Sequence, residues 1–341
     1  MKVFRANIGV SIGLRDFHIE RTKKIMKYIS VKEAAEKWGI SQTLVRRYCG
    51  QDRVPNAKCQ CGTWLIPDKA KKPEKASPAP RTLELLPLAK KLVQQKKKKN
   101  YHGLYDYVQI DFTYSSSRMA SNRLTRDQVE SIFRKGKVQE SFEPMKVSDL
   151  VEVMNHCVCI DYILDHVNEP LTQKFIQHLH YLLMFGSVDH RQKRVTPGVY
   201  RNELTKRRTR PMPDPKKINS VINHIICSYE ANDEVEVTDI LDFHAQFEKA
   251  VPFEDGNGRI GRLIMFKECL RYGITPFIID DKKRGQYIEG LQAWPSDQET
   301  LLQIVEIAQK RFERQIRRHL SAEGRQPHPD DEDDAEGWDD E

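Results

Sequence analysis

The chain has 341 residues, of which 31% are charged and 39% apolar, and these proportions fit a folded protein with some solvated extensions. No apolar run reaches the roughly 20 residues that a membrane helix needs, and the first twenty residues lack the continuous apolar core of a secretory signal. Seven cysteines without a regular framework predict free thiols in a reducing, cytoplasmic compartment. Composition therefore argues against a membrane or secreted protein.

The formal net charge of +7 is unevenly distributed along the chain. Residues 330–341 hold nine acidic side chains and no basic one, so the remainder carries +16. A basic body predicts affinity for polyanions. The last segment, 323–341, has the composition of a disordered acidic tail. At the other end, residues 1–25 have no clear place in a folded domain, and we expect an unstructured leader there.

Residues 26–73 predict a small helix-turn-helix domain. Ser30 is followed three residues later by Glu33, which is a capping box at the start of a short helix. Gly39 ends this helix, and Ser41 can cap a second one. Two short helices across a tight turn form the helix-turn-helix pattern.

The second helix of such a pair presents its polar side chains to DNA. The predicted DNA contacts are Gln42, Thr43, Arg46 and Arg47. With the segment WLIP at 64–67, the unit resembles the excisionase-like helix-turn-helix family, in which a helix pair is followed by a small hairpin. The resemblance implies that residues 30–66 bind DNA. A small docking module without DNA contact is the alternative.

The remainder of the chain is predicted to be mainly α-helical. Residues 74–99 form a basic linker that ends in a helix with four lysines at 96–99. Between 100 and 322, apolar residues recur at three- and four-residue spacing. This periodicity predicts helices at 125–136, 148–164, 171–186, 215–230, 237–250, 257–273 and 297–316. Residues 195–215 break the pattern and are predicted to form a hairpin flap over the site that the helices build.

The stretch PFEDGNGRIGR, residues 252–262, has the features of a phosphate site. Two glycines around an asparagine let successive amides point the same way, and the helix that follows has a positive N-terminus. Arg259 and Arg262 are three residues apart, so both can reach over the first turn. Asp255, or less favourably Glu254, can hold Mg²⁺ against phosphate oxygens. Together these features predict a site for a nucleoside triphosphate.

This stretch resembles the signature of the Fic (Fido) family, HPFx[DE]GNGRxxR, and PGVYRN at 197–202 resembles the start of the family's substrate-aligning flap. The likeness extends over about residues 100–320. It implies a helical fold that transfers AMP from ATP to a hydroxyl of a target protein bound along the flap. Carried over by position, Asp255 would hold Mg²⁺ and Phe253 would anchor the loop. The phosphates would be held by Gly256, Asn257, Gly258, Arg259 and Arg262.

Tyr287 follows the motif helix and would lie near the adenine, although core packing explains it equally well. Two positions depart from the family. Val251 stands where the family has the histidine that takes the proton from the attacking hydroxyl, and losing a general base costs about 10²–10⁴ in rate. Many Fic proteins also carry an inhibitory [ST]xxxE[GN] pattern. In residues 116–125 we match Ser116 and Asn122 to it, which puts Ala120 at the glutamate position.

Three functional hypotheses follow. The first is a degenerate adenylyltransferase, a pseudoenzyme that binds ATP and Mg²⁺ with weak or no transfer, coupled to a DNA-binding regulatory head. The second is an active adenylyltransferase that uses an unconventional base. The third is a DNA-binding regulator in which the Fic fold is a scaffold. Val251 favours the first. The sequence predicts no oligomeric state.

Overall fold

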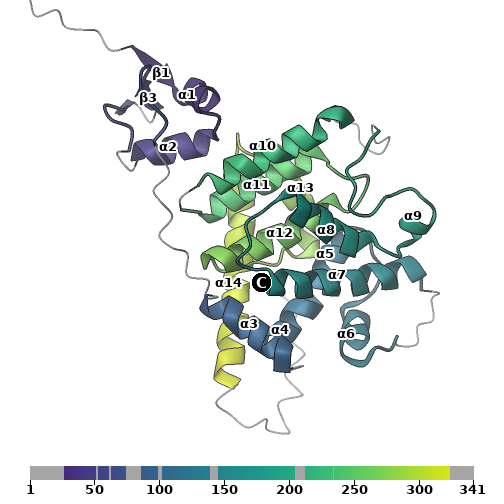
Figure 1. The fold of residues 1–341 in the computed structure, drawn as a ribbon. Coiled ribbons are helices and arrows are strands. Elements are labelled where there is room, and N and C mark those ends of the chain that lie inside the picture. The colour runs from purple at the N-terminus through teal and green to yellow at the C-terminus, as the bar shows by residue number, and fades with distance from the viewer. Residues whose placement is uncertain are drawn as a thin grey trace, which may run out of the picture. The chain divides into compact units, whose positions relative to one another are not determined.

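The computed structural model describes residues 27–50, 53–60, 63–73, 86–98, 102–138, 145–203, 212–232 and 234–322. The predicted leader and acidic tail lie outside these residues. The chain divides into two compact units, one within residues 1–73 except 39–44, the other comprising 39–44 and everything from 74 onward. Figure 1 shows a small unit with strands and a larger helical one.

The first unit is built on a three-stranded antiparallel sheet. Its strands, β1 (Tyr28–Ser30), β2 (Lys58–Gln60) and β3 (Thr63–Pro67), lie in the order β1-β3-β2. α1 (Val31–Trp38) follows β1 directly. The predicted capping box is present, because the Ser30 amide donates to Glu33 Oε2 at 2.7 Å and the Glu33 amide donates to Ser30 Oγ at 3.2 Å.

α2 (Gln42–Gly50) begins where the sequence predicts, since Ser41 Oγ accepts from the Leu44 amide at 3.1 Å. The apolar side chains of this helix are buried: Leu44, Val45 and Tyr48. Two of the four predicted DNA contacts have described side chains, and both are exposed: Gln42 and Arg46. The side chains of Thr43 and Arg47 lie outside the described part of the chain.

The second unit confirms the mainly helical prediction. Its helices are α3 (Pro87–Lys98), α4 (Leu104–Tyr107), the π-helix η1 (Val108–Phe112), α5 (Thr113–Met119), α6 (Arg126–Lys135), α7 (Val147–Asp165), α8 (Gln173–Met184), α9 (Val188–Arg191), the 3₁₀ turn η2 (Pro215–Lys217), α10 (Ile218–Glu230), α11 (Val237–Ala250), α12 (Asn257–Tyr272), the 3₁₀ turn η3 (Asp281–Lys283), α13 (Arg284–Ala293) and α14 (Glu299–Ala322). None of the described helices is long and apolar enough to cross a membrane.

α12 is the central helix of this unit. It packs against α11, α7, α8, α3 and α5, and almost all of its residues are buried. A helix buried on every side has no polar face, so the two motif arginines, Arg259 and Arg262, are buried with it. The α12 helix is therefore held in place by its packing against α11 and α7.

The flap predicted at 195–215 is described only in part. Residues 195–203 and 212–214 run as a loop without a helix, and residues 204–211 lie outside the described residues. Within the visible part, buried Arg201 fastens the flap to the motif loop. Its Nε donates to the Val251 carbonyl at 2.7 Å, and its amide donates to the Pro252 carbonyl at 2.9 Å. The hairpin itself stays a prediction.

Candidate nucleotide site

The GNGR motif forms the connection from α11 into α12. α11 ends at Ala250, and Val251 caps it in the left-handed conformation, with φ 45 and ψ 63. Gly256, with φ 78, is the N-cap of α12. Glycine adopts this conformation without steric cost. Val251 is β-branched, so its backbone is strained and is held in place by its surroundings.

The loop between these caps is closed by the side chain of Asn257. The Phe253 amide donates to Asn257 Oδ1 at 2.9 Å, and Asn257 Nδ2 donates to the Phe253 carbonyl at 2.8 Å. The Asn257 side chain is thus engaged within the loop, and what it can offer an anion is its main-chain amide in the first turn of α12.

Phe253 is fully buried and stacks on His180, with 3.7 Å between ring centroids. His180 Nδ1 accepts from the Gly198 amide at 2.9 Å, so the proton resides on Nε2, which lies 3.2 Å from the Asp255 carbonyl. Burial lowers the pKa of His180 to about 3. A neutral histidine therefore ties the flap to the motif loop, and Phe253 anchors that loop as the resemblance implies.

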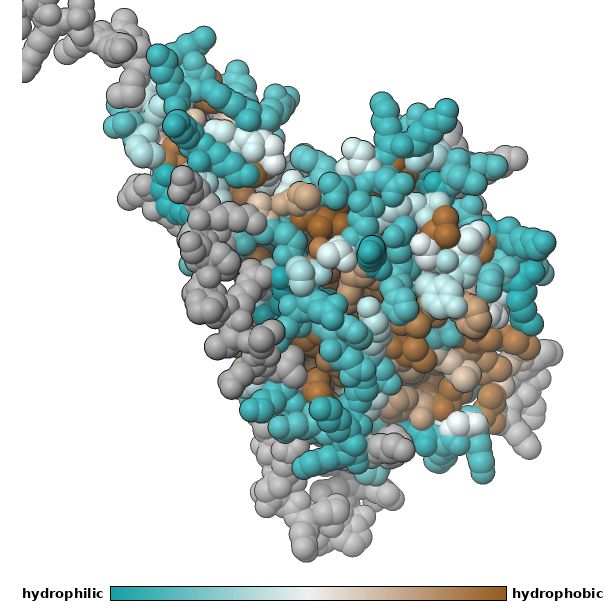
Figure 2. Space-filling view, viewed as in Figure 1, coloured by the Kyte–Doolittle hydropathy of each residue, from teal (hydrophilic) through white to brown (hydrophobic). Residues whose placement is uncertain are grey.

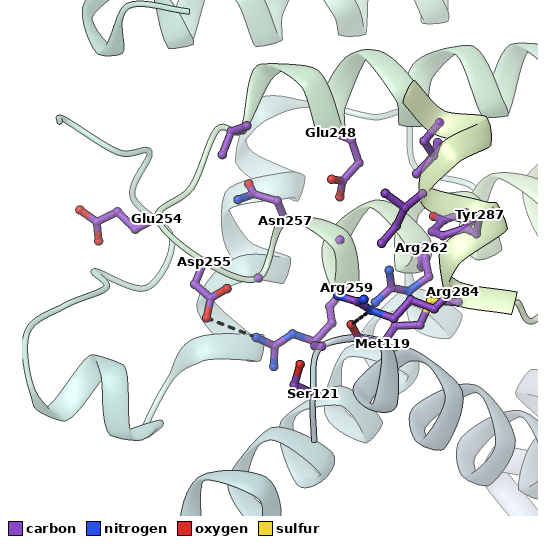
Figure 3. Close-up of a pocket in the computed structure, with 16 residues that line it drawn as sticks. Met119, Ser121, Glu248, Glu254, Asp255, Asn257, Arg259, Arg262, Arg284 and Tyr287 are labelled. Carbon is purple, nitrogen blue, oxygen red and sulfur yellow. Dashed lines mark hydrogen bonds and ion pairs between the residues drawn. The ribbon is translucent and has the colours of Figure 1, made fainter. Parts of the chain in front are cut away.

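A pocket of about 330 Å³ opens over the first turn of α12 (Figure 3). Every nucleotide- or metal-binding residue predicted from the sequence lines it, as does the residue at the base position: Val251, Asp255, Gly256, Asn257, Gly258, Arg259, Arg262 and Tyr287. The helix N-terminus and its neighbouring arginines make this an environment for an anion.

Arg259 lies on the α7 side of the pocket. Its Nη1 is 2.9 Å from Glu152 Oε2, and its Nη2 is 3.8 Å from Asp255 Oδ2, which Figure 3 shows as a dashed line. Burial raises the pKa of Glu152, and the Arg259 guanidinium opposes that shift. α7 therefore supplies a carboxylate that fixes Arg259 beside the predicted metal ligand.

Arg262 lies on the opposite side. Its Nε donates to Ser116 Oγ at 3.1 Å and its Nη2 to the Ser116 carbonyl at 2.9 Å. Burial lowers the Arg262 pKa, while Tyr287 and the charge of Glu248 oppose that shift. Tyr287 Oη also lies 2.5 Å from His244 Nε2. Tyr287 thus both lines the pocket and supports Arg262.

The match of the inhibitory pattern to Ala120 requires a correction. The spacing of [ST]xxxE[GN] is met by Ser117 and Asn122, which puts Ser121 at the glutamate position. Ala120 caps the C-terminus of α5, and Ser121 follows with φ 72. Both residues line the pocket. Neither carries a carboxylate, so the conclusion that this segment offers none to Arg262 is unchanged.

Sequence reasoning missed two charged residues of the pocket. Glu248 lies on α11 three residues before Val251, and this helical spacing was the signal that could have found it. Arg284 opens α13, and its Nε donates to the Met119 carbonyl at 3.0 Å. Arg284 and Met119 are 165 residues apart, so the sequence did not indicate this contact.

The candidate metal ligand is Asp255. Figure 3 shows Glu254 directed away from Arg259. Burial and the charge of Glu203 raise the Glu254 pKa, and the backbone of Thr196 opposes that shift. Across the described residues, no three His, Cys, Asp or Glu side chains are grouped to hold a metal ion. A single carboxylate suits Mg²⁺, which commonly binds through one or two carboxylates plus substrate phosphates.

Comparison with known proteins agrees with this geometry. Residues 170–269 match the model of the Fic/DOC family. The chain carries a Fic domain. The Fic family is one of AMPylating enzymes that bind nucleotide, typically ATP with Mg²⁺, and target proteins. No curated protein matches the chain.

Solved structures share the Fic fold. A Fic-domain-containing signaling protein from Bacteroides thetaiotaomicron is 20% identical, with a TM-score of 0.54 over 70% of this chain and 97% of its own. Fic-1 from C. elegans is 17% identical, with a TM-score of 0.52 over 69% of this chain and 74% of its own. At these identities the likeness establishes the fold.

Proposed function

We propose that this Fic-domain protein binds ATP with Mg²⁺ and transfers AMP weakly or not at all. The proposal rests on the residues that line one pocket. The start of α12, Arg259, Arg262 and Asp255 line it together, and Val251 lines it where an acceptor is required. Valine has no lone pair, so residue 251 cannot take the proton from a bound target hydroxyl.

Among the described residues, no histidine replaces the missing base. His244 is fully buried, and burial lowers its pKa to about 3. Its Nε2 meets Tyr287, and its ring lies against Gly261, where an added Cβ would be 2.3 Å from Nδ1. Within the described part of the chain, no histidine lines this pocket. These contacts favour a degenerate enzyme over an active one with a histidine recruited from elsewhere.

We also propose that the N-terminal unit binds DNA and couples nucleotide binding to regulation. The support is the capped α1–α2 pair together with the exposed side chains of Gln42 and Arg46 on α2. A target or effector protein would approach the pocket along the flap, which Arg201 fastens to the loop that carries Val251.

Calorimetry with Mg–ATP tests the nucleotide proposal. Wild type binds, and Arg259→Ala abolishes binding. Because Arg259→Ala also breaks a buried ion pair, the matched control is Arg126→Ala. Arg126 pairs with Asp111 at 2.9 Å and does not line the pocket. Absence of binding in wild type, or equal loss in both variants, refutes the assignment of the site.

A further inference from the structure

A second cavity lies between α13 and α14, and we call it the α13–α14 groove. Its volume is about 280 Å³, close to the 330 Å³ of the pocket over α12. None of the residues that line the groove lines that pocket. Its apolar lining residues are Ile278, Ile304, Ile307 and Ala308. Pockets for small ligands begin at about this size and are lined mainly by apolar side chains.

The groove has an apolar floor and an apolar edge. Ile278, Ile304 and Ala308 are buried, whereas Ile307 is 62% exposed, more than any other large apolar side chain in the described part of the chain. Exposed apolar side chains also lie along α7, where Figure 2 shows brown surface. A single exposed isoleucine needs no special explanation. At the edge of an apolar cavity, however, it extends the lining to the surface, so that a ligand can bury the floor and the edge together.

The charged lining residues favour an anion. Arg311 Nη1 on α14 lies 2.9 Å from Asp280 Oδ2, and this ion pair joins the two walls of the groove. The third charged lining residue is Lys283 on η3. Two positive charges and one negative charge leave the lining with a net charge of +1. A ligand with an apolar body and one negative group is therefore complementary to the groove.

α13 separates the groove from the nucleotide pocket. Lys283 and Gln286 line the groove. Arg284 and Tyr287, which are their neighbours in sequence, line the nucleotide pocket and are labelled there in Figure 3. A ligand in the groove therefore contacts a different face of α13 from a bound nucleotide.

We propose that the α13–α14 groove binds a small organic anion with an apolar body, such as a medium-chain carboxylate. The apolar body packs against the isoleucines of the lining, and the carboxylate lies beside Lys283. This second site goes beyond the proposed function and does not depend on nucleotide binding.

NMR titrations of octanoate with the full chain test the proposal, with octanamide as the uncharged analogue. Wild type binds octanoate with a Kd below about 1 mM. Octanamide binds about three- to fivefold more weakly, as expected for the loss of a partly exposed charge pair. Lys283→Gln removes this preference. The matched control is Lys282→Gln, on the same turn but outside the lining of the groove, and it keeps the preference.

Ile307→Glu tests the apolar edge. It removes an apolar contact and adds a negative charge, so octanoate affinity falls about tenfold or more. Val158→Glu makes the same change at an exposed position of α7 outside the groove, and it leaves the affinity unchanged. The side chains of Ile307 and Lys283 are exposed, so their replacement leaves the packing of the fold intact.

The proposal is overturned if octanoate shows no saturable binding up to about 10 mM, or if octanamide binds as tightly. It is also overturned if Val158→Glu weakens binding as much as Ile307→Glu, or if Lys282→Gln removes the preference as Lys283→Gln does. The two ligands compared on wild type decide the question even if a variant fails to fold. ATP binding is measured separately, and its absence refutes the proposed function while this inference stands.

Discussion

Replacing Val251 with histidine supplies a proton acceptor at the one lining position where the family signature requires it. Val251 already faces the pocket from the loop that Arg201 and Phe253 hold in place. A side chain introduced there enters a cavity of about 330 Å³. Because the surrounding loop contacts use main-chain atoms of residue 251, the substitution leaves them available.

The expected magnitudes follow from this geometry. A positioned general base contributes about 10²–10⁴-fold to proton-transfer chemistry, so AMP transfer by Val251→His should exceed that of wild type by this factor. Val251 has φ 45, where a β-branched residue is a genuine outlier. Such strain costs of order 1–3 kcal/mol, and histidine tolerates positive φ better. The free energy of unfolding should therefore not fall.

The assay is transfer of label from ATP carrying a labelled α-phosphate to protein in a lysate, with Mg²⁺ present. Val251→Asn is the matched control, because asparagine accepts the left-handed conformation and offers no general base. Labelling by the histidine variant alone shows that residue 251 limits transfer. If the variant binds ATP but labels nothing, or if the asparagine variant labels as well, the lack of a base at residue 251 is not what limits transfer.

Three further outcomes are expected. Gly261→Ala should lower the melting temperature sharply, because the added Cβ would lie 2.3 Å from His244 Nδ1. Gly285→Ala should not, because an added Cβ there would have no neighbour within 4 Å. Equal effects of the two substitutions would contradict this packing. The lowered pKa of His180 means that its neutral form stabilises the fold above its unfolded pKa, about 6.5, and that this stability is lost as pH falls towards 3. The free energy of unfolding measured in urea should therefore fall more steeply between pH 6.5 and pH 3 for wild type than for His180→Gln. If it falls equally in both, the lowered pKa of His180 is wrong. Arg46→Ala should weaken duplex DNA binding by the full chain and flatten its salt dependence; unchanged binding removes Arg46 from the DNA contacts.

Short-range patterns predicted much of what the structure contains. The Ser30–Glu33 spacing identified a capping box that is present, and apolar periodicity identified α11 and α12 to within one residue. These features depend on neighbours three or four residues apart, which the sequence displays directly.

Contacts between distant segments were not predictable in the same way. Arg262 meets Ser116 across 146 positions, and Arg284 meets Met119 across 165. Glu248 resembles any polar residue of an amphipathic helix until α12 is packed against α11. The left-handed backbone of Val251 is imposed by the turn into the motif, against the preference of valine itself.

Nucleotide binding without efficient transfer can be tested in a single incubation. The purified chain is mixed with Mg²⁺, α-labelled ATP and lysate, and the label is divided into reversibly bound and acid-stable fractions. We expect close to one equivalent of reversibly bound nucleotide and almost no acid-stable label. Rapid accumulation of acid-stable label on protein, or the absence of bound nucleotide, would contradict this expectation.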